Sequence, residues 1–377
     1  MVSICLKVSA GSVTFQITKI PDKPQNPLIF IAGSFNNWNP GDIEFKLHKT
    51  EAGYEIMLDF PKGDFVEYKF TQGSWNTVEK DADFAEIANR THNVTDEDQT
   101  LNHTILNWRN DAASSSSHVA TITGNVQLIK DFYMPQLDRK RNIRIYLPPD
   151  YAKTQKRYPV IYMHDGQNLF DESTSFSGEW KIDESLESLF NEGRFNGAVV
   201  VGIDNHPRKR SDELIPWNNP EYGGGKGDAY VDFITLTLKT WIDENYLTLT
   251  DAQNTAIAGS SLGGLISLYA GCKYPETYGK IGIFSPAFWV ANPEIRQYVI
   301  SHPLLRQTRV YIDVGTMEGN NAKQRKAYLK DAEAMNDLLA KTSTPKNNLK
   351  FIVDEGAKHH ESFWAKRFPD AILWLFH

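Results

Sequence analysis

The chain has 377 residues, of which 41% are hydrophobic and 23% charged, and this length is comfortable for two globular domains. The formal net charge of −7 argues against a nucleic-acid partner, which would favour a basic surface. The sequence has no apolar run of about eighteen residues, the length that a membrane-spanning helix needs.

Residues 1–108 contain short strand-like runs separated by turns rich in Pro, Gly and Asn. We predict strands at 12–17, 28–32, 54–58 and 67–71, and we expect an immunoglobulin-like β-sandwich. The stretch that follows is rich in Ser and Ala and lacks periodicity, so residues 109–118 are predicted to form a flexible linker.

Residues 119–377 alternate apolar strands with helical patterns, which predicts an α/β fold. Strand-like runs without polar alternation indicate a mostly parallel sheet with helices on both faces. The predicted strands are 121–129, 142–146, 160–163, 198–203, 255–258, 280–284, 309–314 and 349–353. The predicted helices are 182–191, 229–246, 262–272, 323–341 and 362–376.

A glycine-flanked serine, Gly259-Ser260-Ser261-Leu262-Gly263, lies between a buried strand and a helix. This G-x-S-x-G spacing is typical of a nucleophile in a sharp strand-to-helix turn, where glycines two positions away avoid collisions with the backbone. We therefore predict Ser261 as the nucleophile of an α/β hydrolase. Ser260 is expected to point into the protein.

The base and the acid of such a site follow the serine in chain order. His359 and His360 both lie in the loop after the last predicted strand, and the residue pattern leaves both open as the base. Position favours Glu318 over Asp313 as the acid, because Asp313 lies inside the strand end. A metal site at His359-His360-Glu361 is disfavoured for lack of a third ligand at metal spacing, so we expect no metal and no cofactor.

The oxyanion of an acyl-transfer reaction needs two backbone N–H donors. Leu262, directly after the nucleophile, is expected to supply one. The turn after the strand at 160–163 is expected to supply the other, from Gln167 or, as second choice, Gly166.

Residues 119–377 resemble the "Putative esterase" (esterase D-like) family, which includes feruloyl and acetyl-xylan esterases of carbohydrate esterase family 1 and enterochelin esterases. The resemblance rests on YPVIYMHDGQNLFD, VVVGIDN, AGSSLGG, IDVGTMEG and HHESFWAKRFPDAILWLF. In this family the catalytic histidine precedes a tryptophan by five positions, which implies His359 before Trp364. The family's acid follows a Gly-Thr pair by two positions, which implies Glu318, although many members have Asp as the acid.

The N-terminal residues resemble glycogen- and starch-binding modules of carbohydrate-binding families 48 and 20, through IAGSFNNWNP, EYKFTQGSW and NRTHNV. The resemblance implies that Trp38 and Trp75 stack on sugar rings beside Lys69 and Asn93. Flat aromatic faces suit the apolar faces of pyranose rings. Core packing of the two tryptophans is the alternative.

We expect a serine ester hydrolase that removes acetyl or hydroxycinnamoyl groups, such as ferulate, from carbohydrate. Trp180, Trp217, Phe288 and Trp289 are candidates for the substrate pocket, with core packing as the alternative. A siderophore trilactone esterase is a second hypothesis, for which Arg208, Lys209 and Arg210 offer a basic cluster. A glycan-binding protein with a vestigial hydrolase domain is a third. The absence of a visible signal peptide leaves the compartment open.

Overall fold

The computed structural model describes residues 10–22, 26–36, 38–84, 87, 89–109, 121–175, 178–206, 209–220, 222–319 and 322–377. Contacts divide the chain into two compact units, residues 1–119 and 120–377. The linker predicted over 109–118 lies outside the described residues, apart from Arg109. Within the described part, no helix is long and apolar enough to span a membrane.

The first unit is built mainly from short β-strands. Its four-stranded sheet has the order β3 (His48–Thr50), β4 (Gly53–Pro61), β1 (Ala10–Lys19) and β8 (Gln99–Thr104). Its three-stranded sheet has the order β2 (Phe30–Gly33), β5 (Phe65–Thr71) and β7 (Arg90–Asn93), and β6 (Glu79–Lys80) pairs with β9 (Asn107–Trp108). Phe15 of β1, Ile31 of β2 and Phe70 of β5 are fully buried in one cluster, so the two larger sheets share a core.

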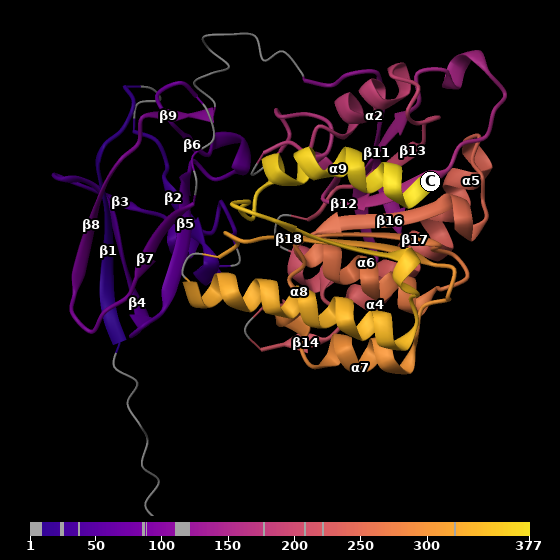
Figure 1. Ribbon diagram of the computed structural model, residues 1–377. Coiled ribbons are helices and arrows are strands. Elements are labelled where there is room, and N and C mark those ends of the chain that lie inside the picture. Colours follow the sequence, from indigo (N-terminus) through magenta and orange to yellow (C-terminus); the bar gives the residue numbers. More distant parts are fainter. Residues whose placement is uncertain are drawn as a thin grey trace, which may run out of the picture. The chain divides into compact units, whose positions relative to one another are not determined.

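The second unit is organised around one eight-stranded sheet (Figure 1). Its order is β10 (Asn125–Met134), β11 (Arg139–Leu147), β13 (Val199–Ile203), β12 (Val160–His164), β16 (Thr255–Ser260), β17 (Lys280–Phe284), β18 (Arg309–Gly315) and β19 (Leu349–Asp354). The pairs on either side of β11 are antiparallel, and the other five pairs are parallel. The predicted mostly parallel sheet is therefore confirmed.

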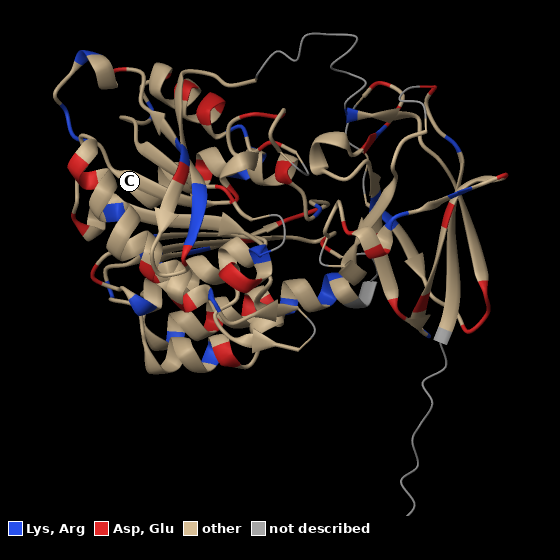
Figure 2. Cartoon of the chain, turned by 180° about the vertical axis from the view of Figure 1, so that it is seen from behind, with Lys and Arg blue, Asp and Glu red and all other residues tan. Residues whose placement is uncertain are grey.

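Helices cover both faces of this sheet (Figure 1). The apolar faces of α2 (Ile182–Asn191) and α9 (Glu361–Phe376) share one buried cluster with the sheet. The opposite cluster contains residues of α3 (Arg210–Leu214), α4 (Gly227–Asp232), α5 (Lys239–Asn245), α6 (Leu262–Lys273), α7 (Glu294–Ser301) and α8 (Ala322–Thr342). The helix predicted over 229–246 is interrupted by a π-helical segment, Phe233–Leu238. Acidic and basic residues are interspersed along the helices (Figure 2).

The carboxyl ends of the parallel strands lie at one edge of the sheet, and this edge positions the predicted catalytic residues. In register, Ser260 of β16 is level with Phe284 of β17, which is level with Asp313 of β18. Ser261 therefore emerges from the sheet beside the segments that follow β17 and β18. Loops at this edge are where open α/β sheets place their ligands.

Candidate active site

Ser261 occupies a strained turn between β16 and α6. Its φ of 57° and ψ of −119° lie outside the regions that residues with a Cβ favour. Its N–H donates to the carbonyl of Phe284 (3.0 Å), and its carbonyl accepts from the N–H of Ala287 (3.1 Å). These bonds to the segment at the end of β17 hold the turn, and the first residue of α6 follows at Leu262.

The two glycines that flank the turn have unequal roles. A Cβ on Gly259 would lie 2.9 Å from the ring of His164 and 3.0 Å from the backbone of Gly263, so a side chain there would collide as predicted. A Cβ on Gly263 would first meet His164 at 3.4 Å, an ordinary contact. Outside its own helix, the atoms nearest to a Cβ on Gly263 belong to the side chain of His164, so the predicted collision with neighbouring backbone is not observed there.

His164, a buried residue at the end of β12, lies beneath the serine turn and was not identified from the sequence. Its Nδ1 is 2.9 Å from the hydroxyl of Tyr230, and its Nε2 is 3.2 Å from Oγ of Ser267. Burial lowers the pKa of His164 to about 4, so the ring stays neutral at pH 7. We interpret it as a support for the turn.

His359 and Glu318 form a hydrogen-bonded pair at the same edge. Nδ1 of His359, in the loop between β19 and α9, lies 3.0 Å from Oε2 of Glu318. The Glu318 side chain is fully buried, whereas that of His359 is 27% exposed. A buried carboxylate at Nδ1 fixes the tautomer that leaves Nε2 able to accept a proton. No hydrogen bond joins Nε2 of His359 to Oγ of Ser261, both among the described residues, and such contacts commonly tighten only when substrate binds.

The two alternatives left open by the residue pattern have other partners. His360 is the N-cap of α9, and its Nδ1 accepts from the N–H of Ser362 (3.2 Å). Asp313 accepts from the backbone N–H of Ser285 (3.1 Å) and from Nε of Arg367 (2.9 Å). Burial raises the pKa of Asp313 to about 7, against the opposing effect of Arg367.

The hydroxyl of Ser285, directly after β17, connects the acid to α9. It donates to Oε1 of Glu318 and accepts from Nε1 of Trp364 (2.8 Å) and from the guanidinium of Arg367 (3.0 Å). Oε1 of Glu318 also accepts from the N–H of Gly315 (2.6 Å). This network was not predicted from the sequence, because Ser285 and Arg367 are 82 residues apart along the chain.

The N–H groups of Leu262 and Gln167 have no acceptor among the described residues. Leu262 is the first residue of α6, where N–H groups lack intrahelical partners. Gln167 lies in the short 3₁₀ turn Gly166–Asn168, where its side-chain oxygen accepts from the N–H of Asn205 (3.0 Å). Both donors are therefore available to a negatively charged ligand atom.

Close packing positions the turn that contains Gln167. A Cβ on Gly166 would lie 2.7 Å from the backbone of Gly202 in β13 and 2.9 Å from the N–H nitrogen of Asp204. Asp165 has a left-handed φ of 56° and accepts two bonds of 2.7 Å from the guanidinium of Arg210. Burial disfavours its charge, but Arg210 outweighs this effect and lowers the pKa of Asp165.

Of the predicted pocket aromatics, Trp289 is exposed, and it packs against Tyr328, whose ring packs against His359. Trp180 is 2% exposed and Phe288 fully buried, so their predicted contact with substrate is wrong: both fill the core. Trp217 packs edge-on against Tyr269 and Tyr298.

Trp289, 39% exposed, belongs to a row of aromatic rings that reaches the histidine. Its ring centroid lies 5.1 Å from that of Tyr222 and 6.0 Å from that of Tyr328. The Tyr328 ring in turn lies 5.5 Å from His359. Tyr222 and Tyr328 were not identified from the sequence, because they lie far along the chain from His359.

In the first unit, the rings of Trp38 and Trp75 lie side by side, with centroids 6.2 Å apart and planes inclined by 37°. Both are partly exposed. Lys69 is only 4% exposed. Asn93 is opposite Phe65, four residues along β5 from Lys69, or about 13 Å. The structure thus brings the tryptophans together but separates Asn93 from Lys69.

Comparisons with known proteins match this architecture. The sequence model of the family described as "Putative esterase" matches residues 135–375. The chain is 31% identical over 243 residues to the uncharacterized protein YbbA of Bacillus subtilis, covering 63% of this chain and 92% of YbbA. An endo-1,4-beta-xylanase/feruloyl esterase of Xylanibacter ruminicola is 26% identical over 187 residues, which are 47% of this chain and 24% of that protein.

Two further matches extend the comparison. An alpha-amylase of Niallia circulans is 40% identical over 101 residues, 26% of this chain and 8% of the amylase. The solved structure of the enterobactin esterase FES from Shigella flexneri superposes with a TM-score of 0.54 at 14% identity, over 93% of this chain and 88% of that one. At this identity the structural match shows a common fold alone.

Proposed function

The chain belongs to the putative esterase family, and on this premise we propose that it hydrolyses carboxylic esters through an acyl-enzyme on Ser261. The observation that carries the proposal is the bond between His359 and buried Glu318 at the sheet edge from which Ser261 emerges. A vestigial hydrolase would have no need to keep a charged carboxylate buried against a histidine, because such burial is costly.

The proposed reaction has two steps. Ser261 Oγ transfers its proton to Nε2 of His359 and attacks the ester carbonyl carbon, and the N–H groups of Leu262 and Gln167 stabilise the oxyanion. When this tetrahedral intermediate collapses, the bond from the carbonyl carbon to the alcohol oxygen breaks, and the alcohol leaves with the proton from His359. In the second step, water gives a proton to His359 and attacks the carbonyl carbon of the acyl-enzyme. The second tetrahedral intermediate then collapses, which releases the acid and returns the proton from His359 to Ser261. Glu318 stays ionised throughout.

An aromatic acyl group is the substrate feature that the site favours. The exposed face of Trp289 and the adjacent Tyr328 offer flat apolar surface within reach of His359. An acetyl group has no ring to use this surface, whereas a hydroxycinnamoyl group does. The similarity to the xylanase/feruloyl esterase supports a hydroxycinnamoyl ester of a carbohydrate.

The siderophore hypothesis has less support, because the basic cluster on which it depends is engaged in ion pairs. Lys209 pairs with Asp212 (3.2 Å), and Arg210 pairs with Asp165 (2.7 Å). Arg208 lies outside the described residues. The two paired residues therefore offer little net positive charge to an anionic trilactone.

We expect methyl ferulate to have the highest kcat/KM when its turnover is compared with that of p-nitrophenyl acetate, acetylated xylan and a catecholate trilactone. Trp289→Ala should raise KM for methyl ferulate about 10-fold, because a ring-stacking surface is lost, and leave p-nitrophenyl acetate nearly unchanged. Tyr133→Ala removes a ring that is 52% exposed on β10 and serves as the control. A higher kcat/KM for the trilactone would contradict an aromatic acyl site. So would an equal rise in KM for methyl ferulate and p-nitrophenyl acetate in Trp289→Ala.

We further propose that the first unit is an immunoglobulin-like sandwich that binds an α-glucan through Trp38 and Trp75. Their adjacent rings support this, as does the similarity of about a quarter of the chain to an alpha-amylase.

Trp75→Ala should weaken the affinity for amylopectin, measured by retardation in affinity gels, at least about 10-fold, since stacked rings dominate such contacts. Met57→Ala, at a 67% exposed position on β4, should migrate like the wild type. Unchanged retardation of Trp75→Ala would assign the tryptophans to packing.

A further inference from the structure

His164 connects the two turns that supply the proposed oxyanion donors. It is the last residue of β12, and Gln167 follows three positions later in the turn Gly166–Asn168. Its side chain lies against the serine turn: a Cβ on Gly259 would be 2.9 Å from its ring, and a Cβ on Gly263 would be 3.4 Å from its own Cβ. His164 therefore touches the serine turn with its side chain and leads into the Gln167 turn with its backbone.

The hydrogen bonds of the His164 ring have a fixed direction. The hydroxyl of Ser267 in α6 donates to the carbonyl of Gly263 (2.7 Å), and a hydroxyl has only one proton to give. Its oxygen, 3.2 Å from Nε2 of His164, must therefore accept from an Nε2–H group. Because the buried ring is neutral, Nδ1 carries no proton and accepts from the hydroxyl of Tyr230 (2.9 Å). One chain of hydrogen bonds thus runs from α4 through the ring to the backbone two residues after Ser261.

This chain suits His164 to a positioning role and not to proton transfer. Both ring nitrogens are bonded within the protein, and the residue is only 2% exposed, so neither nitrogen is available to substrate. A buried polar group with all its bonds made holds its neighbours in one arrangement. Oxyanion donors need such a support, because a displacement of about 1 Å can lower the rate about 10²-fold.

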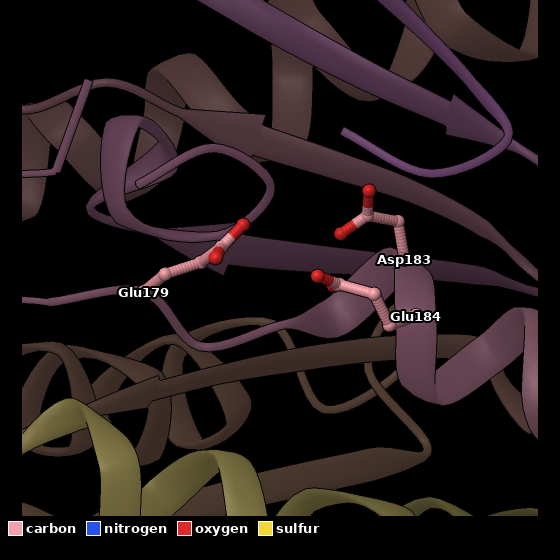
Figure 3. A group of neighbouring side chains, drawn as sticks. All are labelled: Glu179, Asp183 and Glu184. Carbon is pink, nitrogen blue, oxygen red and sulfur yellow. The ribbon is translucent and has the colours of Figure 1, made fainter. Parts of the chain in front are cut away.

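The other side of the Gln167 turn is anchored to the segment before α2. The hydroxyl of Thr174 donates to the carbonyl of Gln167 (2.7 Å), and the N–H of Trp180 donates to the carbonyl of Asn168 (2.8 Å). Around this point the helix begins with carboxyl groups that face one another, as Figure 3 shows for Glu179, Asp183 and Glu184. These bonds fix the turn relative to α2, but they do not set its distance from Ser261.

We propose that His164 is a positioning residue that sets the spacing between the two oxyanion donors, the N–H groups of Leu262 and Gln167. Its ring fills the space beside the two flanking glycines, and its bond to Ser267 ties it to the helix that begins with Leu262. The backbone of the same residue continues into the turn of the second donor. The inference rests on the proposed function, because the oxyanion is that of the proposed ester hydrolysis.

Kinetics with methyl ferulate and the affinity for an aryl trifluoromethyl ketone test this role. The ketone adds to a serine nucleophile and forms a tetrahedral adduct with a negatively charged oxygen, so its affinity reports the oxyanion donors. His164→Leu should lower kcat and ketone affinity about 10²-fold each, while KM and the inhibition constant of free ferulate change less than about 2-fold. His164→Gln, whose amide can still donate to Ser267, should recover part of both losses.

Tyr230→Phe keeps the test decisive should His164→Leu fold poorly, because it removes only the hydroxyl that donates to Nδ1. It should lower kcat and ketone affinity about 5-fold each, since one of the two bonds that hold the ring is lost. Tyr278→Phe is the matched control: this tyrosine is also buried on the same face of the sheet, and its hydroxyl is 2.8 Å from that of Thr235. Its replacement should leave both values unchanged.

Three results would overturn the positioning role: unchanged kcat and ketone affinity in His164→Leu or Tyr230→Phe, a fall in kcat without a fall in ketone affinity, or an equal loss in Tyr278→Phe and Tyr230→Phe. Labelling of the wild type by an aryl phosphonate separates this role from the proposed function. A wild type that is not labelled on Ser261 contradicts the proposed function. A wild type labelled on Ser261, together with His164 variants of unchanged kcat, contradicts the positioning role alone.

Discussion

Replacing Ser261 with alanine is expected to lower kcat for methyl ferulate about 10⁴-fold or more, while KM and the unfolding midpoint change little. The reason is chemical: alanine has no oxygen to attack the carbonyl, and the remaining donors only orient water. The strained φ of 57° also makes the serine a poor choice for any purely structural role. Steady-state kinetics with methyl ferulate measures the loss.

Ser260→Ala is the matched control, since this neighbouring serine is 5% exposed at the end of β16. An aryl phosphonate should add one covalent group to the wild type and to Ser260→Ala, as seen in the intact mass, and none to Ser261→Ala. Retention of more than a tenth of kcat by Ser261→Ala, or labelling of that variant, would assign the nucleophile to another residue.

Glu318→Gln is expected to lower kcat about 10³- to 10⁴-fold through the tautomer of His359. Oε1 of Glu318 accepts from Gly315 and Ser285, so the carbonyl oxygen of a glutamine would take this position. Its NH₂ group would then donate to Nδ1 of His359, which would leave the ring proton on Nε2. In that tautomer the histidine cannot accept the proton of Ser261.

Kinetics on Glu318→Gln, Glu318→Asp and Glu355→Gln test this assignment. The aspartate keeps the charge and should recover part of kcat. Glu355 is exposed in the loop after β19, and its replacement should leave kcat unchanged. Near-wild-type activity of Glu318→Gln would falsify the assignment of the acid, and equal losses in the glutamine and aspartate variants would mean that packing rather than charge matters.

Much of the second unit could be predicted because its parallel strands are buried on both faces. The runs predicted for β12, β16, β17 and β18 lie within the observed strands, and α2 has the predicted bounds. The shorter helices α3 and α7 were missed, since five to eight residues give too little periodicity. The strand predicted over 121–129 is observed at Asn125–Met134, where a register shift interrupts its pairing with β11.

For the site, the sequence indicated where the functional side chains lie but not which groups support them. The resemblance to the family implied His359 rather than His360, and the structure adds that His360 caps a helix. Ser285 and Arg367 were missed because their bonds join segments distant in sequence. Trp180 was wrongly predicted to line the pocket, because an aromatic residue near a site has the same sequence pattern as one in the core.

The hydroxyl of Ser285 accepts two hydrogen bonds from side chains of α9, and this affects how the site responds to heat. Elements of a fold open locally at free energies below that of global unfolding. Each time α9 detaches from the sheet, Trp364 and Arg367 leave Ser285, and the carboxylate of Glu318 loses the alignment that this hydroxyl provides. Detachment of α9 alone would therefore be enough to misalign the proposed catalytic acid, without any unfolding of the sheet.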